Sequence, residues 1–375
     1  MRRQEFHGSE ALGRRLFTQL EVMQVAGVGA EGQPVLKSLN GVVDEGWVCF
    51  HGSPAGEKTS LVGRPVVVSV EETVARLPSY FMDPERACPA TTLYRAAQAH
   101  GVLQPIEDPA RKARVLQRLM EKLQPEGGFV PLEAGSPLYR AQVMGLLIAG
   151  LPLDGLTTKV KLAQNRTPAQ RGALLEKLWA RGAAGDARAL ELIREANPET
   201  PVPPFLAAPE DATLHAWLPA DAAPDAAALL EGEYWNDVFT REDLERAHRG
   251  ATAWVGVRDG AGALIGTARA LADGGKYAWI YDVCVRRDWR GRGVGKALMR
   301  LLLDHPAVRG CRVARLGTRD AQSLYAGFGF VPLASLPPRP YPTTEMLLRR
   351  GQQGPGAHPP SPRAGQDEAT ASPGA

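Results

Sequence analysis

The sequence predicts an α+β protein built from two domains, and three observations carry that prediction. Short strand-like runs follow one another closely in the first part of the chain, a pattern typical of an antiparallel β-barrel. Strands and helices alternate in the later part, which indicates a mixed α/β sheet. Between the two parts, residues 197–209 are dense in proline and cannot continue a helix, so they behave as a semi-rigid spacer.

The chain has 375 residues, enough for two or three domains. We divide it into a first domain at 1–200, a proline-rich linker at 201–211, a second domain at 212–350 and a tail at 351–375. The tail is rich in Gly, Pro, Ser, Gln and Ala and has almost nothing to bury. We therefore expect the tail to be disordered.

In the first domain, the pattern predicts short strands with helices packed on them. The expected strands lie at 23–28, 34–39, 46–50, 65–70 and 141–149, and the expected helices at 11–20 and 111–123. A further helix begins after Thr167 and Pro168, which combine an N-cap residue with a proline in the first helical turn.

In the second domain, strands are expected at 214–218, 252–257, 264–271, 277–285 and 312–316, followed by two closing strands. Helices are expected at 223–230, 241–249, 294–304 and 320–326. The helix at 294–304 is the clearest, because Val294, Leu298 and Leu301 share one face and Pro306 ends it.

Composition restricts the classes of function. Lys and Arg number 44 against 41 Asp and Glu, and this near balance gives no reason to expect a nucleic-acid partner or a membrane surface. The longest apolar stretch, 143–153, is far shorter than the roughly 20 residues that a membrane span needs. No signal peptide can be read at the N-terminus, and the four cysteines lack the C-x-x-C spacing of a zinc site or redox dithiol. We expect a soluble, cytoplasmic protein without a bound metal.

A glycine-rich loop is the strongest chemical signal. Arg290-Gly291-Arg292-Gly293-Val294-Gly295 lies between the expected strand 277–285 and the expected helix 294–304. Glycines let the backbone approach a ligand, and amides at a helix N-terminus attract an anion such as a pyrophosphate. The two arginines add forked donors. A tight strand-to-helix turn would also need glycine, and the spacing differs from that of a Rossmann fold.

Further motifs surround this loop in a fixed order. They are Glu233-Tyr234-Trp235, Gly266-Thr267-Ala268-Arg269, Asp282-Val283-Cys284-Val285, the segment from Thr318-Arg319-Asp320 to Tyr325, and Phe328-Gly329-Phe330. Together they resemble the GNAT superfamily of acyl-CoA-dependent N-acyltransferases over essentially all of 212–350. The resemblance implies a GNAT fold and the transfer of an acetyl group from acetyl-CoA to the amine of a small molecule or peptide.

The resemblance also implies which residues act. Val283 and Val285 would contact acetyl-CoA through their main chain, where the strand carries a bulge. The pyrophosphate would be cradled by Arg290, Gly291, Arg292, Gly293, Val294, Gly295 and Lys296. Tyr325 matches the family's general acid, and a phenol can protonate the departing thiolate because their reference pKa values are close. Asp282 is the candidate general base, with Glu233 or bulk water as alternatives.

The first domain resembles a second family. Its motifs are Phe50-His51-Gly52-Ser53-Pro54-Ala55-Gly56-Glu57-Lys58, Pro89-Ala90-Thr91-Thr92-Leu93-Tyr94-Arg95 and Lys159-Val160-Lys161-Leu162-Ala163-Gln164-Asn165-Arg166. Their order is similar to that of the FMN-binding split barrel of the pyridoxamine-phosphate-oxidase superfamily, over about residues 10–200.

This second resemblance implies a flavin cofactor, FMN. Its phosphate would lie near Ser53 and Lys58, with Lys37, Thr92 and Tyr94 as further contacts, and the barrel would form a homodimer. Two alternatives to an acyltransferase with an accessory barrel therefore stay open. One is an FMN-dependent oxidoreductase in which the barrel is the working half. The other is a flavin-binding regulator, although no helix with clustered basic residues for reading DNA is visible.

Overall fold

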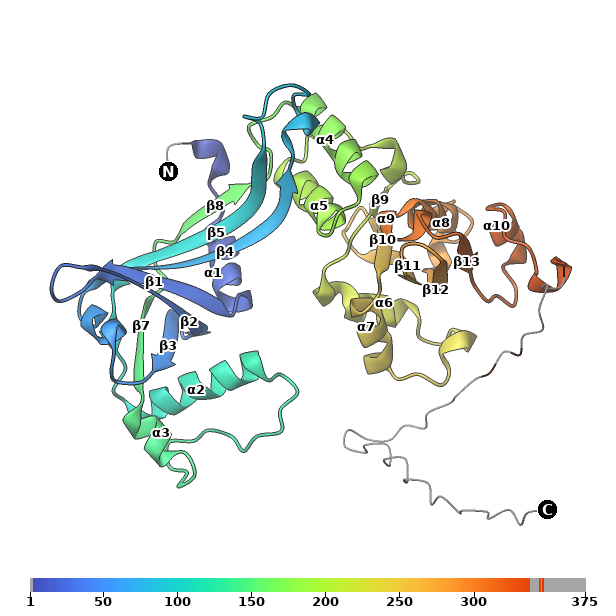
Figure 1. Cartoon of the computed structure of the whole chain (residues 1–375). Helices are drawn as coiled ribbons and strands as arrows, with labels where there is room; N and C mark the ends of the chain where they lie inside the picture. The colour runs from blue at the N-terminus through green and yellow to red at the C-terminus, as the bar shows by residue number, and fades with distance from the viewer. Residues whose placement is uncertain (1–2, 338–343, 345, 347–375) are drawn as a thin grey trace, which may run out of the picture. The chain divides into compact units, whose positions relative to one another are not determined.

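A computed structural model describes residues 3–337, 344 and 346. By its contacts the chain divides into two compact units, Met1–Arg319 and Asp320–Ala375. The tail expected at 351–375 lies outside the described residues. The fold is mixed α/β, with a curled antiparallel sheet followed by a smaller mixed sheet, and the predicted fold class is confirmed (Figure 1).

The N-terminal sheet has eight strands in the order β6-β7-β3-β2-β1-β4-β5-β8, and every neighbouring pair is antiparallel. The strands are β1 (Val22–Val28), β2 (Pro34–Asp44), β3 (Trp47–Gly52), β4 (Pro65–Leu77), β5 (Thr91–Val102), β6 (Gln104–Pro105), β7 (Leu147–Pro152) and β8 (Thr157–Lys161). The long strands β4 and β5 run side by side and bend together (Figure 1). Alternate residues such as Val66, Val68 and Val70 are buried, so the period of two places one face of β4 on the core.

Helices α1 and α2 pack on this sheet. Helix α1 (Glu10–Gln19) is capped by Ser9, and Phe17 joins the core inside the curled sheet. Helix α2 (Pro109–Leu123) is capped by Asp108 and packs on β2 and β3. The ammonium of Lys122 donates to three backbone carbonyls, those of Phe17, Leu20 and Gly41, and burial lowers its pKa to about 8.

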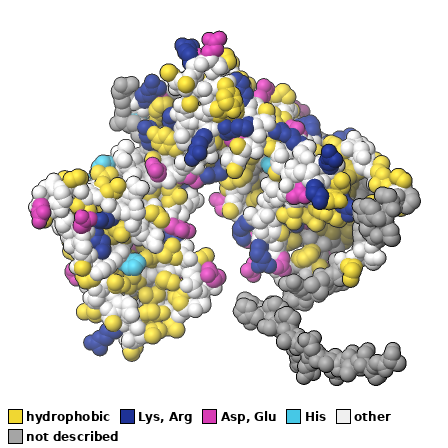
Figure 2. Space-filling view, in the orientation of Figure 1, with side chains coloured by type: hydrophobic (Ala, Val, Ile, Leu, Met, Phe, Trp, Pro, Cys, Tyr) yellow, Lys and Arg dark blue, Asp and Glu magenta, His cyan; other side chains and the backbone are white. Residues whose placement is uncertain are grey.

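A helical hairpin, α4 (Pro168–Arg181) and α5 (Asp186–Ala196), follows β8. Thr167 and Gln170 form a capping box at the start of α4, and Gly182 ends it in the left-handed conformation. Figure 2 shows Lys and Arg side chains (dark blue) over the part of the surface that carries these two helices. Near the C-terminal end of α4, the Trp179 indole donates to the Asp304 carboxylate at 2.6 Å. The hairpin is thereby joined to the second sheet's main helix.

The second sheet has five strands in the order β13-β12-β11-β10-β9. They are β9 (Ala212–His215), β10 (Ala253–Asp259), β11 (Leu264–Ala272), β12 (Tyr277–Val285) and β13 (Val313–Arg315), and only the β12–β13 pair is parallel. Helices α6 (Ala223–Leu229) and α7 (Arg241–Arg249) pack on each other, and α6 packs on β11. Helix α8 (Val294–Asp304) packs on β10, β11 and β12, and α9 (Pro306–Arg309) follows it.

The second unit contains α10 (Gln322–Ala326) and a short 3-10 helix, Leu333–Ser335, among its described residues. Residues 327–337 contain no strand, so the expected closing strands do not begin there. The rest of the segment expected to hold them, through residue 350, lies outside the described residues apart from 344 and 346.

One element prediction is wrong, and several elements were not predicted. The strand expected at 141–149 is instead helix α3 (Arg140–Gly145) followed by β7, because β7 must begin at Leu147 to pair with Gly52 of β3. Strands β5, β6 and β8 and helix α5 were not among the predicted elements. Helix α8 has the bounds that the sequence predicted. Among the described residues, no helix combines the length and the apolar character that crossing a membrane requires.

Acid should destabilise this fold through His305, whose Nδ1 accepts the Ala307 amide at the start of α9. Burial, reinforced by Arg309, lowers the pKa of His305 from its usual 6.5 to about 4. Between these two values the unfolded state binds more protons than the folded state, so stability present above pH 6.5 is lost as the pH falls. From pH 7 to pH 5 this group alone should lower the free energy of unfolding by about 2 kcal/mol.

His305→Asn is the matched variant, because Asn keeps an N-cap acceptor but does not titrate. Urea unfolding of both proteins at pH 7 and pH 5 measures the difference. An equal loss of stability in the two proteins would contradict the assignment.

Candidate functional site

Strand β13 lies beside only the first part of β12. The parallel pairing of β12 with β13 joins Tyr277 to Val313 and ends with Trp279 opposite Arg315. Strand β12 itself continues to Val285. Among the described residues no strand pairs with that edge of β12 beyond Trp279, so its backbone groups there, apart from the Val285 carbonyl oxygen that accepts from Arg290, are available to a ligand.

Strand β12 also carries a bulge inside this open stretch. Its register against β11 pairs Tyr281 with Arg269 but Cys284 with Thr267, so two residues of β12, Asp282 and Val283, lie opposite the single residue Ala268. Asp282 has φ 52°, a left-handed conformation that few residues other than glycine adopt. The bulge that the family resemblance implied is therefore present, and it changes the direction of the strand at Val283.

A buried ion pair holds the bulge. The Arg269 Nε lies 2.6 Å from Oδ2 of Asp282, and both side chains are largely buried. The Arg269 guanidinium also stacks over the Tyr281 ring, 4.9 Å from its centroid. Asp282 was predicted as a general base, and in this arrangement its carboxylate is committed to an arginine.

His248 on α7 is a further buried group near this ion pair. Its Nδ1 lies 2.8 Å from the Leu244 carbonyl oxygen and its Nε2 is buried without a partner. Burial lowers the pKa of His248, an effect that the nearby Asp282 opposes and Arg269 reinforces. The ring is thus neutral at neutral pH, packed edge-on against Trp254.

The glycine-rich loop leads from β12 into α8. Gly291 (φ 81°) and Gly293 (φ 86°) adopt left-handed conformations, and Gly293 is the N-cap of α8. No side chain caps this helix, so its first amides are free to face an anion. The Arg292 guanidinium stacks over Trp289, 4.9 Å from the ring centroid, while Val294 is buried and begins the helix.

Arg290 makes two hydrogen bonds within the protein, and its predicted contact with the pyrophosphate stays a prediction. Its Nε donates to the Val285 carbonyl oxygen at 2.9 Å and its Nη2 to Glu233 at 2.7 Å. The guanidinium therefore ties the loop to the end of β12 and to the segment before α7. Sequence reasoning treated Glu233 as an alternative base and missed this pair, because the two residues are 57 positions apart in the chain.

The buried thiol of Cys284 lies beside this pair, with Sγ 3.1 Å from the Leu229 carbonyl oxygen. Burial, together with Glu233, raises its pKa to about 11. A thiol with this pKa is almost entirely protonated at neutral pH and is a weak nucleophile. Cys284 is therefore unsuited to carry an acyl group.

Tyr325 lies on α10, in the second compact unit. Its side chain is buried and its ring contacts Phe330 edge-on, with 6.1 Å between the centroids. Its assignment as general acid stays a prediction.

The structure adds aromatic residues that the sequence analysis did not select. Tyr277, Trp279 and Tyr281 alternate along β12, and each residue is about two-fifths exposed, at 41%, 40% and 38%. The Arg315 guanidinium lies 5.6 Å from the centroids of both Tyr277 and Trp279. The period-two spacing of aromatics in the sequence was a visible signal for this exposed face.

In the first domain, the predicted flavin contacts fall in two places. The first is the turn after β3, where Gly56 has φ 93° and Lys58 Nζ donates to the Ala55 carbonyl oxygen at 3.0 Å. Lys37 is paired there with Glu57 at 2.5 Å. The Nδ1 of His51 is buried without a partner, and burial, with Lys58 nearby, lowers the pKa of this ring.

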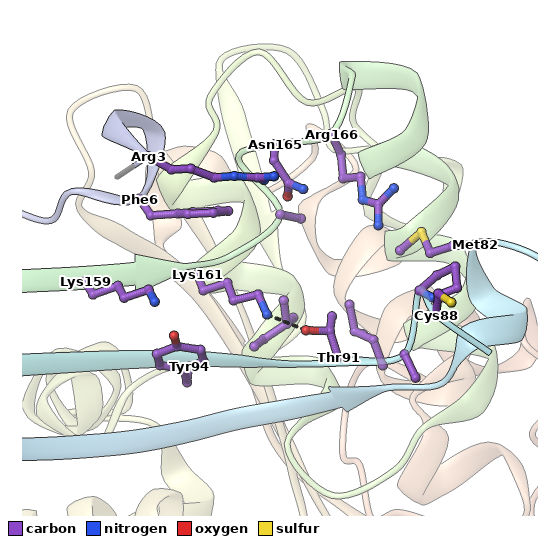
Figure 3. A pocket seen from close by; sticks show the side chains of 15 residues that line it. Arg3, Phe6, Met82, Cys88, Thr91, Tyr94, Lys159, Lys161, Asn165 and Arg166 are labelled. Atoms are coloured by element: carbon purple, nitrogen blue, oxygen red, sulfur yellow. Dashed lines mark hydrogen bonds between the residues drawn. The ribbon is translucent and has the colours of Figure 1, made fainter. Parts of the chain in front are cut away.

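The second place is a cavity of about 460 Å³ beside β5 and β8, which Tyr94 helps to line (Figure 3). Lys37 aligns through β1 and β4 with Ala99, which is five residues along β5 from Tyr94. At about 3.3 Å per residue, Tyr94 therefore lies roughly 16 Å along β5 from the position opposite Lys37. The two residues are also separated across the sheet, since β1 and β4 lie between β2 and β5. Within one chain, Thr92 and Tyr94 therefore do not join Ser53 and Lys58 in one site.

Comparison with known proteins agrees with these two folds. The family described as acetyltransferase (GNAT) matches residues 214–330. The family described as pyridoxamine 5'-phosphate oxidase matches residues 14–149. The chain joins a GNAT acetyltransferase domain to a pyridoxamine phosphate oxidase-like domain. No curated protein matches the chain.

Solved structures resemble each part separately. The FAD and heme binding protein from Mycobacterium smegmatis is 22% identical, with 41% of this chain and 72% of that chain covered and a TM-score of 0.34. A protein from Xanthomonas campestris pv. campestris, assigned to the GNAT family, is 28% identical, with 36% and 96% covered and a TM-score of 0.30. A protein from Deinococcus radiodurans R1, assigned as an acetyltransferase, is also 28% identical, with 38% and 92% covered and a TM-score of 0.29.

Asp282→Asn should destabilise the GNAT domain by about 3 kcal/mol, because it leaves the Arg269 guanidinium buried without its counter-charge. Asn is similar to Asp in size and tolerates the left-handed backbone, so the variant removes the charge and keeps the backbone conformation. Urea unfolding of Asp282→Asn, Arg269→Gln and the double variant measures the coupling. The double variant should be more stable than the sum of the two single losses predicts, and strict additivity would contradict the buried pair.

Proposed function

We propose that the second domain is an N-acetyltransferase that moves the acetyl group of acetyl-CoA to an amine. The observation that carries this proposal is the open edge of β12 beyond Trp279, with its bulge at Asp282, next to the uncapped N-terminus of α8. An extended pantetheine arm needs unpaired backbone groups, and a pyrophosphate needs clustered amides. The two requirements meet in adjoining segments of one chain.

Each end of acetyl-CoA has a proposed contact. Val283 and Val285 hydrogen-bond the pantetheine arm through their main chain. The amides of Gly291, Gly293 and the first turn of α8 hold the pyrophosphate, with Arg292 on the loop and Lys296 in the first turn of α8 as cations. Arg290 holds the loop in place through its bonds to Val285 and Glu233, and it thereby positions the loop amides that bind the pyrophosphate.

The reaction is a direct transfer. A neutral amine attacks the thioester carbonyl carbon, a C–N bond forms, and the C–S bond breaks as the tetrahedral intermediate collapses. The amine nitrogen loses a proton, and the departing thiolate gains one from the Tyr325 phenol. The raised pKa of Cys284 argues against a route through a cysteine acyl-enzyme.

Asp282 has two candidate roles. As a base it would take the proton from the amine. As the ion-pair partner of Arg269 it would instead hold the bulge that presents Val283 to the thioester, and its burial with Arg269 favours this positioning role. In that case water takes the proton.

The acceptor is a small-molecule or peptide amine. The exposed rings of Tyr277, Trp279 and Tyr281 lead along β12 to the bulge, so they form the surface on which its apolar part would lie. This face supports an acceptor with an apolar or aromatic group beside its amine.

Tyr325→Phe should lower kcat by about 100-fold, because the departing thiolate loses its proton donor. The dissociation constant for coenzyme A should stay unchanged. Thiol release from acetyl-CoA across a panel of amines, together with calorimetry of coenzyme A binding, measures both. Tyr139→Phe in the barrel, which removes a hydroxyl bonded to the Val130 carbonyl oxygen, is the matched control. Undiminished activity in Tyr325→Phe would remove the acid assignment.

A second candidate function is flavin binding by the barrel. The turn after β3 supports a phosphate site because it carries Ser53 and the Lys58 ammonium, and because the unpartnered Nδ1 of His51 lies in the last two residues of β3. When bound, FMN would supply redox chemistry at its ring. A homodimer would bring Thr92 and Tyr94 of a second chain to this turn, since one chain holds them apart from it.

Two variants of this turn should change FMN affinity in opposite directions. Lys58→Gln should weaken binding by about 10-fold, since a charge-assisted hydrogen bond is lost. Glu57→Gln should strengthen it, because Lys37 is released from its ion pair and a carboxylate leaves the site. Quenching of FMN fluorescence reports the dissociation constants. A colourless protein that leaves FMN fluorescence unchanged would end this candidate.

A further inference from the structure

Strand β12 lies between β11 and β13 (Figure 1), and its exposed rings share a face with residues of β11. The register places Tyr281 opposite Arg269 and Trp279 opposite Leu271, and directly opposite residues of neighbouring strands lie on the same face. Leu271 is 44% exposed, and the partly exposed rings of Trp279 and Tyr281 are stacked, with 6.1 Å between their centroids and 17° between their planes. We call Leu271, Trp279 and Tyr281 the apolar platform. The ion pair of Arg269 and Asp282 lies at one end of this platform.

Arg269 leaves most of its hydrogen-bonding capacity unused. A guanidinium carries five N–H donors, and in Arg269 only Nε donates, to Oδ2 of Asp282. Its Nη1 and Nη2 donate to no described residue, and neither atom is fully buried. The guanidinium is stacked over the Tyr281 ring, which fixes its plane. The edge formed by Nη1 and Nη2 matches the two oxygens of a carboxylate, so it favours a ligand that carries one.

The carboxylate of the ion pair also has an unused atom. Oδ1 of Asp282 accepts from no described residue and is not fully buried. His248 near the pair adds no charge, since burial lowers its pKa and keeps the ring neutral. The pair therefore presents cationic donors and an anionic acceptor with no net charge. A zwitterion is complementary to this arrangement, whereas a simple amine would match Asp282 alone and leave the donors of Arg269 without an acceptor.

Spacing along β12 suits an α-amino acid. Tyr281, opposite Arg269, is two residues before Val283, whose main chain is the proposed contact of the thioester arm. At about 3.3 Å per residue this separation is roughly 7 Å, so a carboxylate bound to Arg269 leaves room for an amine on the adjacent carbon to face the thioester. In the other direction, Trp279 is two residues from Tyr281, again roughly 7 Å. An aromatic or long apolar side chain covers that span.

We propose that the acceptor is an α-amino acid with an aromatic or large apolar side chain. Its carboxylate binds Nη1 and Nη2 of Arg269, its amine lies at Oδ1 of Asp282, and its side chain lies on the apolar platform. This inference rests on the acetyl transfer proposed above, because it names the acceptor of the same site. The products are the N-acetyl amino acid and coenzyme A. Arg269 thus binds the acceptor in addition to holding the bulge.

Matched acceptors test the need for a carboxylate. The full chain is assayed by thiol release from acetyl-CoA with L-phenylalanine, L-phenylalaninamide and phenethylamine, and with L-tryptophan, L-tryptophanamide and tryptamine. The amide replaces the carboxylate by a neutral group, and the decarboxylated amine lacks it. In at least one series, kcat/KM for the amino acid should exceed that of both counterparts by about 10-fold, because they lose a charge-assisted pair. L-Alanine should be a poorer acceptor than that amino acid, because it leaves the platform uncovered.

Two lysine variants locate the carboxylate contact. Arg269→Lys keeps a cation beside Asp282 but loses the fork of donors, so KM for the preferred amino acid should rise about 10-fold. KM for its decarboxylated counterpart should change by about twofold at most. Arg95→Lys is the matched control, because Arg95 forms the same kind of pair in the barrel, with Nε 2.8 Å from Oε2 of Glu72. This control should leave the preference among acceptors unchanged, and circular dichroism verifies that both variants fold.

Equal use of each amino acid, its amide and its decarboxylated form would overturn the inference, as would a preference that survives Arg269→Lys. If no amine releases the thiol, the proposed acetyl transfer fails, and calorimetry then tests this inference separately. Titrated into the full chain with coenzyme A present, at least one of the two amino acids should bind more tightly than its decarboxylated form, and Arg269→Lys should remove that difference. Equal binding of the two forms, or binding of neither, would contradict an amino-acid site whatever the outcome for acetyl transfer.

Discussion

The left-handed conformation of Asp282 is the constraint on which the second domain's site depends. An aspartate stays in that conformation only while its surroundings hold it, and here the buried Arg269 does so. The extra residue bends β12 at the place where its pairing with β13 has already ended. Helix α8 then approaches closely because Gly266 of β11 has no side chain; a Cβ there would lie 3.0 Å from Leu298 and 3.2 Å from Val294. The bulge, the open edge and the helix N-terminus are therefore linked by packing.

The other end of α8 is held just as firmly. Asp304 accepts the Trp179 indole, and the Arg309 guanidinium donates to the carbonyl oxygens of Trp179 and Ala180. Gly182 permits this docking, since a Cβ at that position would meet Pro306 at 2.2 Å. Helix α8 has free amides at its N-terminus, and its C-terminal end is hydrogen-bonded to the hairpin of α4 and α5. The linker before β9 follows the same helix, where Ala207 accepts from Arg300.

Local signals explain which features the sequence could predict. Helix α8 follows a glycine loop and ends before Pro306, and α4 begins at Pro168 after its N-cap Thr167. Both helix starts could therefore be recognised from a few neighbouring residues. The pairs Arg290–Glu233 and Arg269–Asp282 join residues that meet only after folding, and no spacing rule foretells them. Strand β7 replaced a longer predicted strand because pairing with β3 decides where it begins, and pairing is a tertiary property.

The turn after β3 and the cavity beside β5 and β8 differ in whether a carboxylate lies among their cations. At the turn after β3, Glu57 already neutralises Lys37, and Lys58 directs its ammonium to a backbone carbonyl. The cavity beside β5 and β8 is lined by Lys159, Lys161 and Arg166, and its lining contains no carboxylate. An anion entering the turn must compete with Glu57, whereas one entering the cavity removes an existing repulsion.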